Sequence, residues 1–237
     1  MSGVDIERTD GIATVTMNDG KANIMSAQFL GELITAVRSA ADAGEIVVLR
    51  SSIEGTYSGG FDVKALATRD PATVIEMMKA GADLIHAMLI HPRPIVAAAS
   101  GRIFPMGLFT LLAADYRIGD SEQAQWCLNE AQLGIVPPDY AFDLLRYRFD
   151  SNWLSRAILT ADMMSAADGL AAGVFDRLAS GDEVETQAFR VAKLLADSPA
   201  SSLAGIKRKL RSEVADRIRT SSERELSVEN YRKKYAA

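Results

Sequence analysis

Two short and almost uninterrupted apolar runs constrain the possible folds more than any other feature of the sequence. They are Ile46 to Leu49 and Ile95 to Ala99. A run of this length without polar alternation is typical of a parallel strand buried on both faces. Each run is followed by a loop that contains glycine and then by a segment with helical periodicity. The sequence therefore predicts an α/β fold whose strands are joined by right-handed crossovers.

The segments around these runs continue the alternation. Asp10-Gly11 is a hairpin signal between two strand-like segments, Ser26 and Ser165 are expected helix N-caps, and Gly173 is an expected C-terminal cap. The expected strands are 4–8, 12–17, 46–50, 95–99, 115–119 and 174–178. The expected helices are 26–41, 71–90, 106–114, 140–149, 151–160, 165–172, 183–196 and 202–237. We expect a core over residues 1–195 and a helical region over residues 196–237.

Composition excludes several classes of protein. The chain has 237 residues and a net charge of -5, with no basic stripe of the kind that binds nucleic acid. Cys127 is the only cysteine, so a disulfide framework and a cysteine-based metal site are both excluded. Apolar runs are too short to span a membrane, and the first residues do not resemble a signal peptide. We expect a cytoplasmic protein with no nucleic-acid partner, no membrane partner and no metal.

Few residues are suited to polar chemistry. His86 and His91 lie five apart on one predicted helix and so on different faces, and we interpret both as histidines favoured by the helix C-terminus rather than as a metal pair. Cys127 lies among apolar residues and is interpreted as a buried, unreactive thiol rather than a nucleophile. Fingerprints of hydrolases, P-loop proteins and dinucleotide-binding proteins are missing. If the protein is an acid/base enzyme, a carboxylate has to move the proton.

The loop Tyr57-Ser58-Gly59-Gly60-Phe61-Asp62-Val63-Lys64 follows the first apolar run. Its two adjacent glycines leave the backbone free to adopt positive φ and to approach a ligand closely. Polar loops at the ends of buried strands commonly carry sites in α/β proteins. An ordinary turn between a strand and a helix is the alternative, and this loop alone does not decide between them.

The ordered motifs of the chain resemble those of the crotonase (enoyl-CoA hydratase/isomerase) superfamily. The loop over residues 57–63 is similar to the family's glycine loop, and residues 94–101 are similar to its second strand and loop. Further blocks follow at the expected distances, up to about residue 200. They are Ala22-Asn23, Met106-Gly107, Ala114 to Ile118, Asn129-Glu130, Leu133-Gly134-Ile135, Pro137, Ala166-Ala167 and Gly173 to Asp176.

This resemblance implies a spiral of ββα units with a helical C-terminal region that mediates trimer contacts. It implies an acyl-CoA thioester as the substrate, so coenzyme A is part of the substrate and no separate cofactor is expected. By position, the backbone N–H groups of Phe61 and Met106 would form the oxyanion hole for the thioester oxygen. Glu130 would be the acid/base. A homotrimer or a dimer of trimers is implied.

Two departures from the family pattern bear on the reaction. The usual three-glycine run before the buried helix is Pro105-Met106-Gly107 here, and we expect the Met106 side chain to crowd or reshape the acyl pocket. Hydratases with two catalytic glutamates carry one of them where this chain has Phe109, which cannot move a proton. Glu130 then acts alone, with a pKa raised by an apolar pocket. The alternative for Glu130 is a solvated glutamate on a turn.

The other expected substrate contacts come from the same blocks. Lys21, Lys64 and Arg69 lie near loops that could meet the CoA phosphates, with ordinary surface positions as the alternative. Asp139 is a pocket candidate whose alternative is a solvated residue at a helix N-terminus. The full set of expected substrate-binding residues is Lys21, Ala22, Ser58, Gly60, Asp62, Val63, Lys64, Gly107, Phe109 and Asp139.

The sequence thus predicts an acyl-CoA enzyme of the enoyl-CoA hydratase/isomerase type, and the lone Glu130 favours isomerisation over hydration. Another reaction on the same scaffold, such as thioester hydrolysis or decarboxylation, is the second hypothesis. A catalytically silent acyl-CoA-binding protein is the third, because one of the two glutamates is missing.

Overall fold

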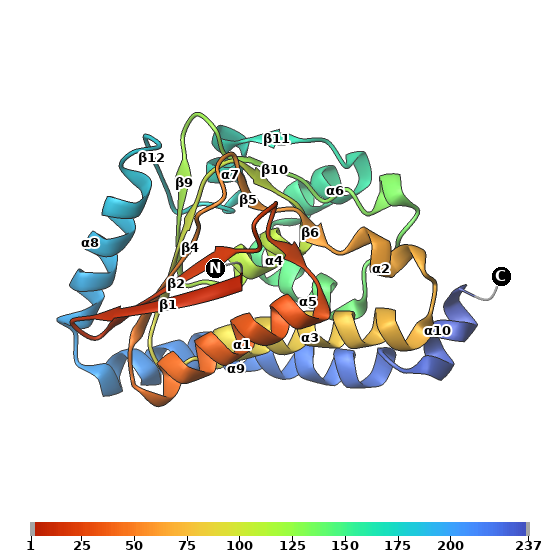
Figure 1. The fold of residues 1–237 in the computed structure, drawn as a ribbon, viewed down its shortest axis with the longest axis horizontal. Coiled ribbons are helices and arrows are strands. Elements are labelled where there is room, and N and C mark those ends of the chain that lie inside the picture. Colours follow the sequence, from red (N-terminus) through yellow and green to blue (C-terminus); the bar gives the residue numbers. More distant parts are fainter. Residues whose placement is uncertain (1–2, 236–237) are drawn as a thin grey trace.

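A six-stranded sheet organises the computed structural model, which describes residues 3–235 (Figure 1). Its order is β1-β2-β4-β7-β9-β12, with β1 antiparallel to β2 and the other neighbours parallel. The strands are β1 (Gly3–Thr9), β2 (Ile12–Asn18), β4 (Ile46–Ser51), β7 (Ile95–Ala99), β9 (Tyr116–Asp120) and β12 (Arg177–Ala179). The two apolar runs form the central strands β4 and β7, as predicted.

Both faces of this sheet are covered by helices, which explains the uninterrupted apolar runs. In β4, Ile46 and Val48 pack in the apolar cluster under α8 (Val184–Ala196). Val47 and Leu49 belong to the main core on the opposite face. That core is covered by α1 (Ala27–Asp42), α3 (Pro71–Ile90) and α4 (Pro105–Ala113).

Short strands after each central strand form a second sheet. Its order is β11-β10-β8-β5, with bounds Met164–Ser165, Gln125–Trp126, Arg102–Ile103 and Thr56–Ser58. A further pair joins β3 (Ile24–Met25) to β6 (Gly60–Phe61). Strands β4, β7 and β9 are each followed by a strand of this second sheet and then by helical structure, so the expected ββα repeat is present. The sequence missed these short strands because two or three residues carry no periodicity.

The helical C-terminal half follows with one correction to its last strand. Its elements are the 3₁₀ turn η1 (Ala131–Leu133), α5 (Asp139–Arg148), α6 (Ser151–Thr160), α7 (Ala166–Ala172), α9 (Ala200–Glu225) and α10 (Val228–Tyr235). Ser165 caps α7 and Gly173 ends it at φ 78°, as predicted. The expected strand over 174–178 was wrong at its start. It begins at Arg177, because Val174 and Phe175 turn into the core after the cap.

The C-terminal helix is interrupted, whereas the sequence predicted one helix to the end of the chain. Helix α9 lies along α3 and α5, and the chain breaks at Leu226 before α10 begins. The expectation for residues 236–237 lies outside the described residues, as does that for residues 1–2. Within the described chain, no helix combines the length and apolar character needed to cross a membrane.

Gly101 provides a test of the close packing between the two sheets. A Cβ atom at Gly101 would lie 2.1 Å from the backbone carbon of Gly55, and the residue has φ of +73°. We expect Gly101→Ala to lower the free energy of unfolding by about 3 kcal/mol or more, because a backbone clash adds to the strain of positive φ. Urea denaturation measures this loss.

Gly44 is the matched control, since its φ is +70° and no atom lies within 4 Å of its added Cβ. Gly44→Ala should cost only about 1–2 kcal/mol, the penalty of a left-handed alanine. Equal losses for the two variants would contradict the packing described.

Candidate active site

A cavity of about 190 Å³ lies between the glycine loop, the start of α4 and the turn that carries Glu130. Its walls are mainly apolar. The lining residues are Gly59, Gly60, Phe61, Val63, Leu66, Met78, Phe104, Pro105, Phe109, Asn129, Glu130, Leu133, Ile135, Pro137 and Pro138. The structure therefore brings together three segments that the sequence singled out separately.

The glycine loop is held by hydrogen bonds to the segment before α1. The Ser58 hydroxyl donates to the carbonyl of Asn23 at 2.8 Å and accepts from the N–H of Gly60 at 3.1 Å. The N–H of Gly59 donates to the carbonyl of Ala22 at 2.7 Å. Ser58 and Ala22 thus fix the loop that borders the cavity.

The loop ends where α2 (Val63–Ala67) begins, earlier than the sequence suggested. The carboxylate of Asp62 caps α2 by accepting from the N–H of Lys64 at 2.9 Å. Val63 lines the cavity. Asp62 therefore sets the direction of the chain as it leaves the cavity wall.

Met106 is the second residue of the buried helix α4. At this position the helix itself supplies no acceptor for the backbone N–H of Met106. Its side chain lies against α3 together with the ring of Phe61. A Cβ atom added to Gly81 of α3 would lie 2.9 Å from Phe61 Cζ and 3.1 Å from Met106 Sδ. Met106 is not among the residues that line the cavity, and Gly81 leaves room for its sulfur beside the ring of Phe61.

Gly107 allows α4 to approach the glycine loop. A Cβ atom at this position would lie 2.4 Å from Cβ of Ser58. Gly60 has φ of +79°, and its own added Cβ would lie 3.2 Å from Cβ of Phe104. The two glycines therefore act by permitting contact between loop and helix.

Glu130 lies on the turn that opens η1. Its carbonyl accepts from the N–H groups of Leu133 at 3.0 Å and Ile135 at 2.9 Å, and Gly134 closes the turn at φ 67°. Its side chain is buried, and Oε2 has no hydrogen-bond partner among the described residues. Burial raises the pKa of Glu130 to about 7. The alternative of a solvated turn glutamate is therefore wrong.

Phe109 lines the same cavity and is almost fully buried. Among the lining residues of this cavity, Glu130 alone carries an ionisable side chain. A single group that exchanges a proton near neutral pH thus faces an apolar space. No group of three or more His, Cys, Asp or Glu side chains within residues 3–235 is arranged to hold a metal ion.

Two other polar groups near the site do not supply an acid or base at neutral pH. Burial raises the pKa of Cys127 to about 12, which agrees with an unreactive thiol. Burial also raises the pKa of Tyr140, and the charges of Glu225 and Glu130 add to this effect. His91 lies at the C-terminus of α3, as expected, and away from this cavity, and burial lowers its pKa to about 4.

Seven of the ten expected substrate-binding residues do not line the cavity. They are Ala22, Ser58, Asp62 and Gly107, which hold its walls, and Lys21, Lys64 and Asp139. Lys21 is exposed on the loop before β3, and Lys64 is exposed in the first turn of α2. Asp139 accepts from Arg224 at 2.7 Å and lines a separate hollow of about 240 Å³. Sequence reasoning missed Met78 and Phe104 as wall residues, since an apolar stripe does not reveal which of its members border a cavity.

The comparisons with known proteins agree on the family. The enoyl-CoA hydratase/isomerase family model matches residues 7–235. The chain belongs to this family. It is 27% identical over 231 residues to mitochondrial enoyl-CoA delta isomerase 1 of Rattus norvegicus, covering 96% of this chain and 79% of that protein. It is 28% identical over 205 residues to carnitinyl-CoA dehydratase of Salmonella enteritidis, covering 85% of this chain and 77% of that protein.

Solved structures show the same fold. An enoyl-CoA hydratase/isomerase family protein from Pseudomonas syringae matches with a TM-score of 0.89 and 31% identity, over 94% of this chain and 96% of that chain. Human mitochondrial delta3-delta2-enoyl-CoA isomerase matches with a TM-score of 0.88 and 26% identity, over 96% of this chain and 90% of that chain. The family and the crotonase fold predicted from the sequence are confirmed, and the family is one of acyl-CoA enzymes of the hydratase/isomerase type.

The buried carboxyl group predicts a pH-dependent stability difference. The pKa of Glu130 rises from 4.5 to about 7 on folding. Ionisation of Glu130 therefore lowers the free energy of unfolding progressively as pH rises from 4.5 to 7, and above pH 7 the loss is at most about 3 kcal/mol. Glu130→Gln removes this cost. Urea denaturation should therefore show the variant gaining stability over the wild type as pH rises from 5 to 8. A difference that does not change with pH would contradict the burial of an isolated carboxyl group.

Proposed function

We propose that the protein catalyses isomerisation of the double bond of an enoyl-CoA, through a thioester enolate and with Glu130 as the single acid/base. The observation that carries this proposal is the unpaired, buried carboxyl group of Glu130, with a pKa of about 7, in an apolar cavity beside Phe61. A carboxyl group with this pKa can both remove and return a proton near neutral pH.

The negative charge of the enolate is proposed to lie on the thioester oxygen, between the N–H groups of Phe61 and Met106. Met106 is suited to this role because its N–H is in the first turn of α4, where the helix dipole also favours negative charge. Phe61 lines the cavity from the glycine loop. One such donor is typically worth about 3 kcal/mol of transition-state stabilisation.

Isomerisation requires one group that moves a proton between two carbon atoms of the acyl chain. In its ionised form, Glu130 would remove a proton beside the thioester carbonyl and then return it farther along the chain. Hydration also requires activation of a water molecule, and Phe109 supplies no second carboxylate for that task. The composition of the cavity wall therefore favours isomerisation over hydration.

The CoA part of the substrate is proposed to extend over the exposed loops beside the cavity. Lys21 and Lys64 offer ammonium groups there for its phosphates. Gly60, Asp62 and Val63 would shape the entrance, while Ser58 and Gly107 hold the loop against α4. Asp139 would reach the substrate only if its pair with Arg224 opened.

Self-association as a homotrimer or a dimer of trimers belongs to the same proposal, as do a cytoplasmic location and a role in fatty acid metabolism. Exposed apolar side chains on α6, on α7 and between them support an interface. Leu159 is 78% exposed, and Met163 and Leu170 are 44% and 45% exposed. The two helices are joined by the pair of Arg156 with Asp168 at 3.5 Å.

Two alternatives are separated by direct assays. Thioester hydrolysis or decarboxylation would release free CoA or carbon dioxide, whereas isomerisation converts a 3-enoyl-CoA into a 2-enoyl-CoA with the thioester intact. A catalytically silent protein would bind acyl-CoA without turnover. Calorimetric titration with an acyl-CoA, followed by assays on 3-enoyl-CoA and 2-enoyl-CoA, distinguishes the three functions.

Glu130→Gln should lower kcat for 3-enoyl-CoA isomerisation by at least about a thousandfold, because the amide cannot exchange the proton, while Kd for acyl-CoA stays within about threefold. In the wild type, kcat/KM should fall as pH drops below about 7, where the carboxylate becomes protonated. Stopped-flow absorbance measures kcat and kcat/KM, and calorimetry measures Kd.

Glu122→Gln is the matched control, since Glu122 is exposed on a turn outside the cavity. Turnover retained in Glu130→Gln, or lost equally in Glu122→Gln, would refute the assignment. Failure of the wild type to bind any acyl-CoA would refute the whole proposal.

A further inference from the structure

A second and larger cavity, of about 960 Å³, opens between α8 and α9 and shares no lining residue with the cavity at Glu130. Its volume is at the upper end of the range for small-molecule sites. One part of its wall is apolar, from Val191, Leu194, Leu195, Leu203, Ile206 and Leu210, and the other part is polar, from Asp115, Arg177, Gln187, Arg190, Lys207 and Arg211.

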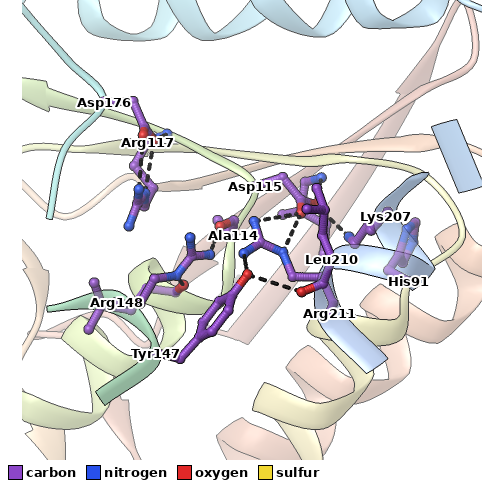
Figure 2. Close-up of polar contacts among 12 residues, drawn as sticks. His91, Ala114, Asp115, Arg117, Tyr147, Arg148, Asp176, Lys207, Leu210 and Arg211 are labelled. Carbon is purple, nitrogen blue, oxygen red and sulfur yellow. Dashed lines mark hydrogen bonds and ion pairs between the residues drawn. The ribbon is translucent and has the colours of Figure 1, made fainter. Parts of the chain in front are cut away.

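A buried ionic network forms the polar end of this cavity (Figure 2). Asp115 accepts from Lys207 at 2.5 Å and pairs with Arg211 at 3.3 Å. Lys207 also donates to the carbonyl of Arg93 at 3.2 Å, and Arg211 donates to the hydroxyl of Tyr147. Helix α9 is thus attached to the starts of β7 and β9 by a cluster that contains two cations and one carboxylate.

Positive charge continues behind this cluster without matching carboxylates. The guanidinium of Arg148 donates to the carbonyls of Leu112 and Ala114, both at 2.6 Å, and forms no ion pair with a carboxylate among the described residues. Burial, together with the nearby charges of Arg117 and Arg211, lowers its pKa to about 9. Burial also lowers the pKa of Lys207. In both cases burial is the main cause, and the charge of Asp115 only partly offsets it.

The network contains more cations than carboxylates. The cations are Arg117, Arg148, Lys207 and Arg211, and the carboxylates are Asp115 and Asp176. Among the described residues, Nε of Arg93 and Nη1 of Arg117 are buried without a hydrogen-bond partner. A buried excess of positive charge next to an open cavity favours an anion there.

Three further side chains of the polar wall, those of Arg177, Gln187 and Arg190, can bind such an anion. Arg177 and Arg190 are exposed and form no ion pair within residues 3–235. Oε1 of Gln187 is buried at the cavity without a partner. Because the two ends of an amide exchange by rotation, Gln187 can also donate to a carboxylate.

Several large apolar side chains of the apolar wall are exposed to solvent. Leu194, Ile206 and Leu210 are 69%, 57% and 60% exposed. They come from the two helices that flank the cavity, so an alkyl chain lying between α8 and α9 would cover them. Burial of such apolar area is worth about 25 cal/mol per Å².

We propose that this cavity binds an amphipathic carboxylate of the fatty acid class, at a site separate from the one at Glu130. The carboxylate lies at the polar end, near Arg177, Arg190 and the Lys207–Arg211 cluster. The alkyl chain lies along the apolar faces of α8 and α9. Charge complementarity selects an anion over a cation or a neutral alcohol with the same chain. This binding does not depend on the reaction proposed above.

Isothermal titration of the whole protein with dodecanoate tests the proposal. We expect one equivalent to bind the wild type in the micromolar range. Arg177→Gln with Arg190→Gln should weaken binding at least tenfold, while Lys207 and Arg211 stay in place to hold α9. The control Arg208→Gln with Lys209→Gln removes equal charge from exposed positions of α9 outside the cavity and should not change Kd.

Two further measurements decide where and how the ligand binds. Dodecyltrimethylammonium, with the same chain and opposite charge, should bind at least tenfold more weakly. Dodecanoate carrying a photoreactive diazirine on its last carbon should label peptides within residues 187–210. Labelling of residues 59–66 or 129–138 instead would overturn the proposal, as would equal binding of the cationic detergent.

A second copy of the chain is the competing occupant of the cavity. Analytical ultracentrifugation of the wild type and the Arg177/Arg190 variant, with and without dodecanoate, tests this directly. An unchanged oligomeric state with weakened dodecanoate binding supports the proposal. A variant that dissociates, together with a wild type that does not bind dodecanoate, would overturn it in favour of a subunit interface.

Discussion

Burial of β4 and β7 on both faces decides where this chain can form a site. Successive residues of β4 pack into opposite cores, so neither face of the sheet is free for a ligand. The glycine loop and the other segments that line the cavity therefore follow the strands, where the second sheet and the starts of the helices lie. The cavity at Glu130 forms where three of these segments meet, at the glycine loop, the start of α4 and the turn before η1.

Close contact between these segments depends on glycines that leave no space for a side chain. Gly107 lets α4 approach Ser58, and Gly81 accommodates the ring of Phe61 and the sulfur of Met106. These two contacts hold α4 close to the glycine loop and to α3. The same packing buries Glu130 without a partner, which lowers stability and at the same time raises its pKa into the range useful for proton transfer.

The sequence predicted the features that depend on local pattern. It gave both central strands, the helices over 71–90 and 151–160 and the cap at Ser165, because apolar runs, periodicity and capping residues act within a few positions. It also indicated Phe61, Phe109 and Glu130, which the structure brings to one cavity. The short strands, the break at Leu226 and the orientation of the Met106 side chain could not be predicted, since each depends on contacts between distant segments. The ionic network around Asp115 was missed for the same reason, because its members come from positions 91 to 211.

The central claim is that Glu130 exchanges a proton with the substrate carbon beside the thioester. Incubation of a 3-enoyl-CoA in D₂O, followed by NMR, measures this exchange directly. The account predicts that the wild type introduces deuterium into the acyl chain at the positions that lose and gain a proton, and that Glu130→Gln does not while still binding the thioester. Rapid deuterium incorporation by Glu130→Gln, or none by a wild type that binds the substrate, would contradict it.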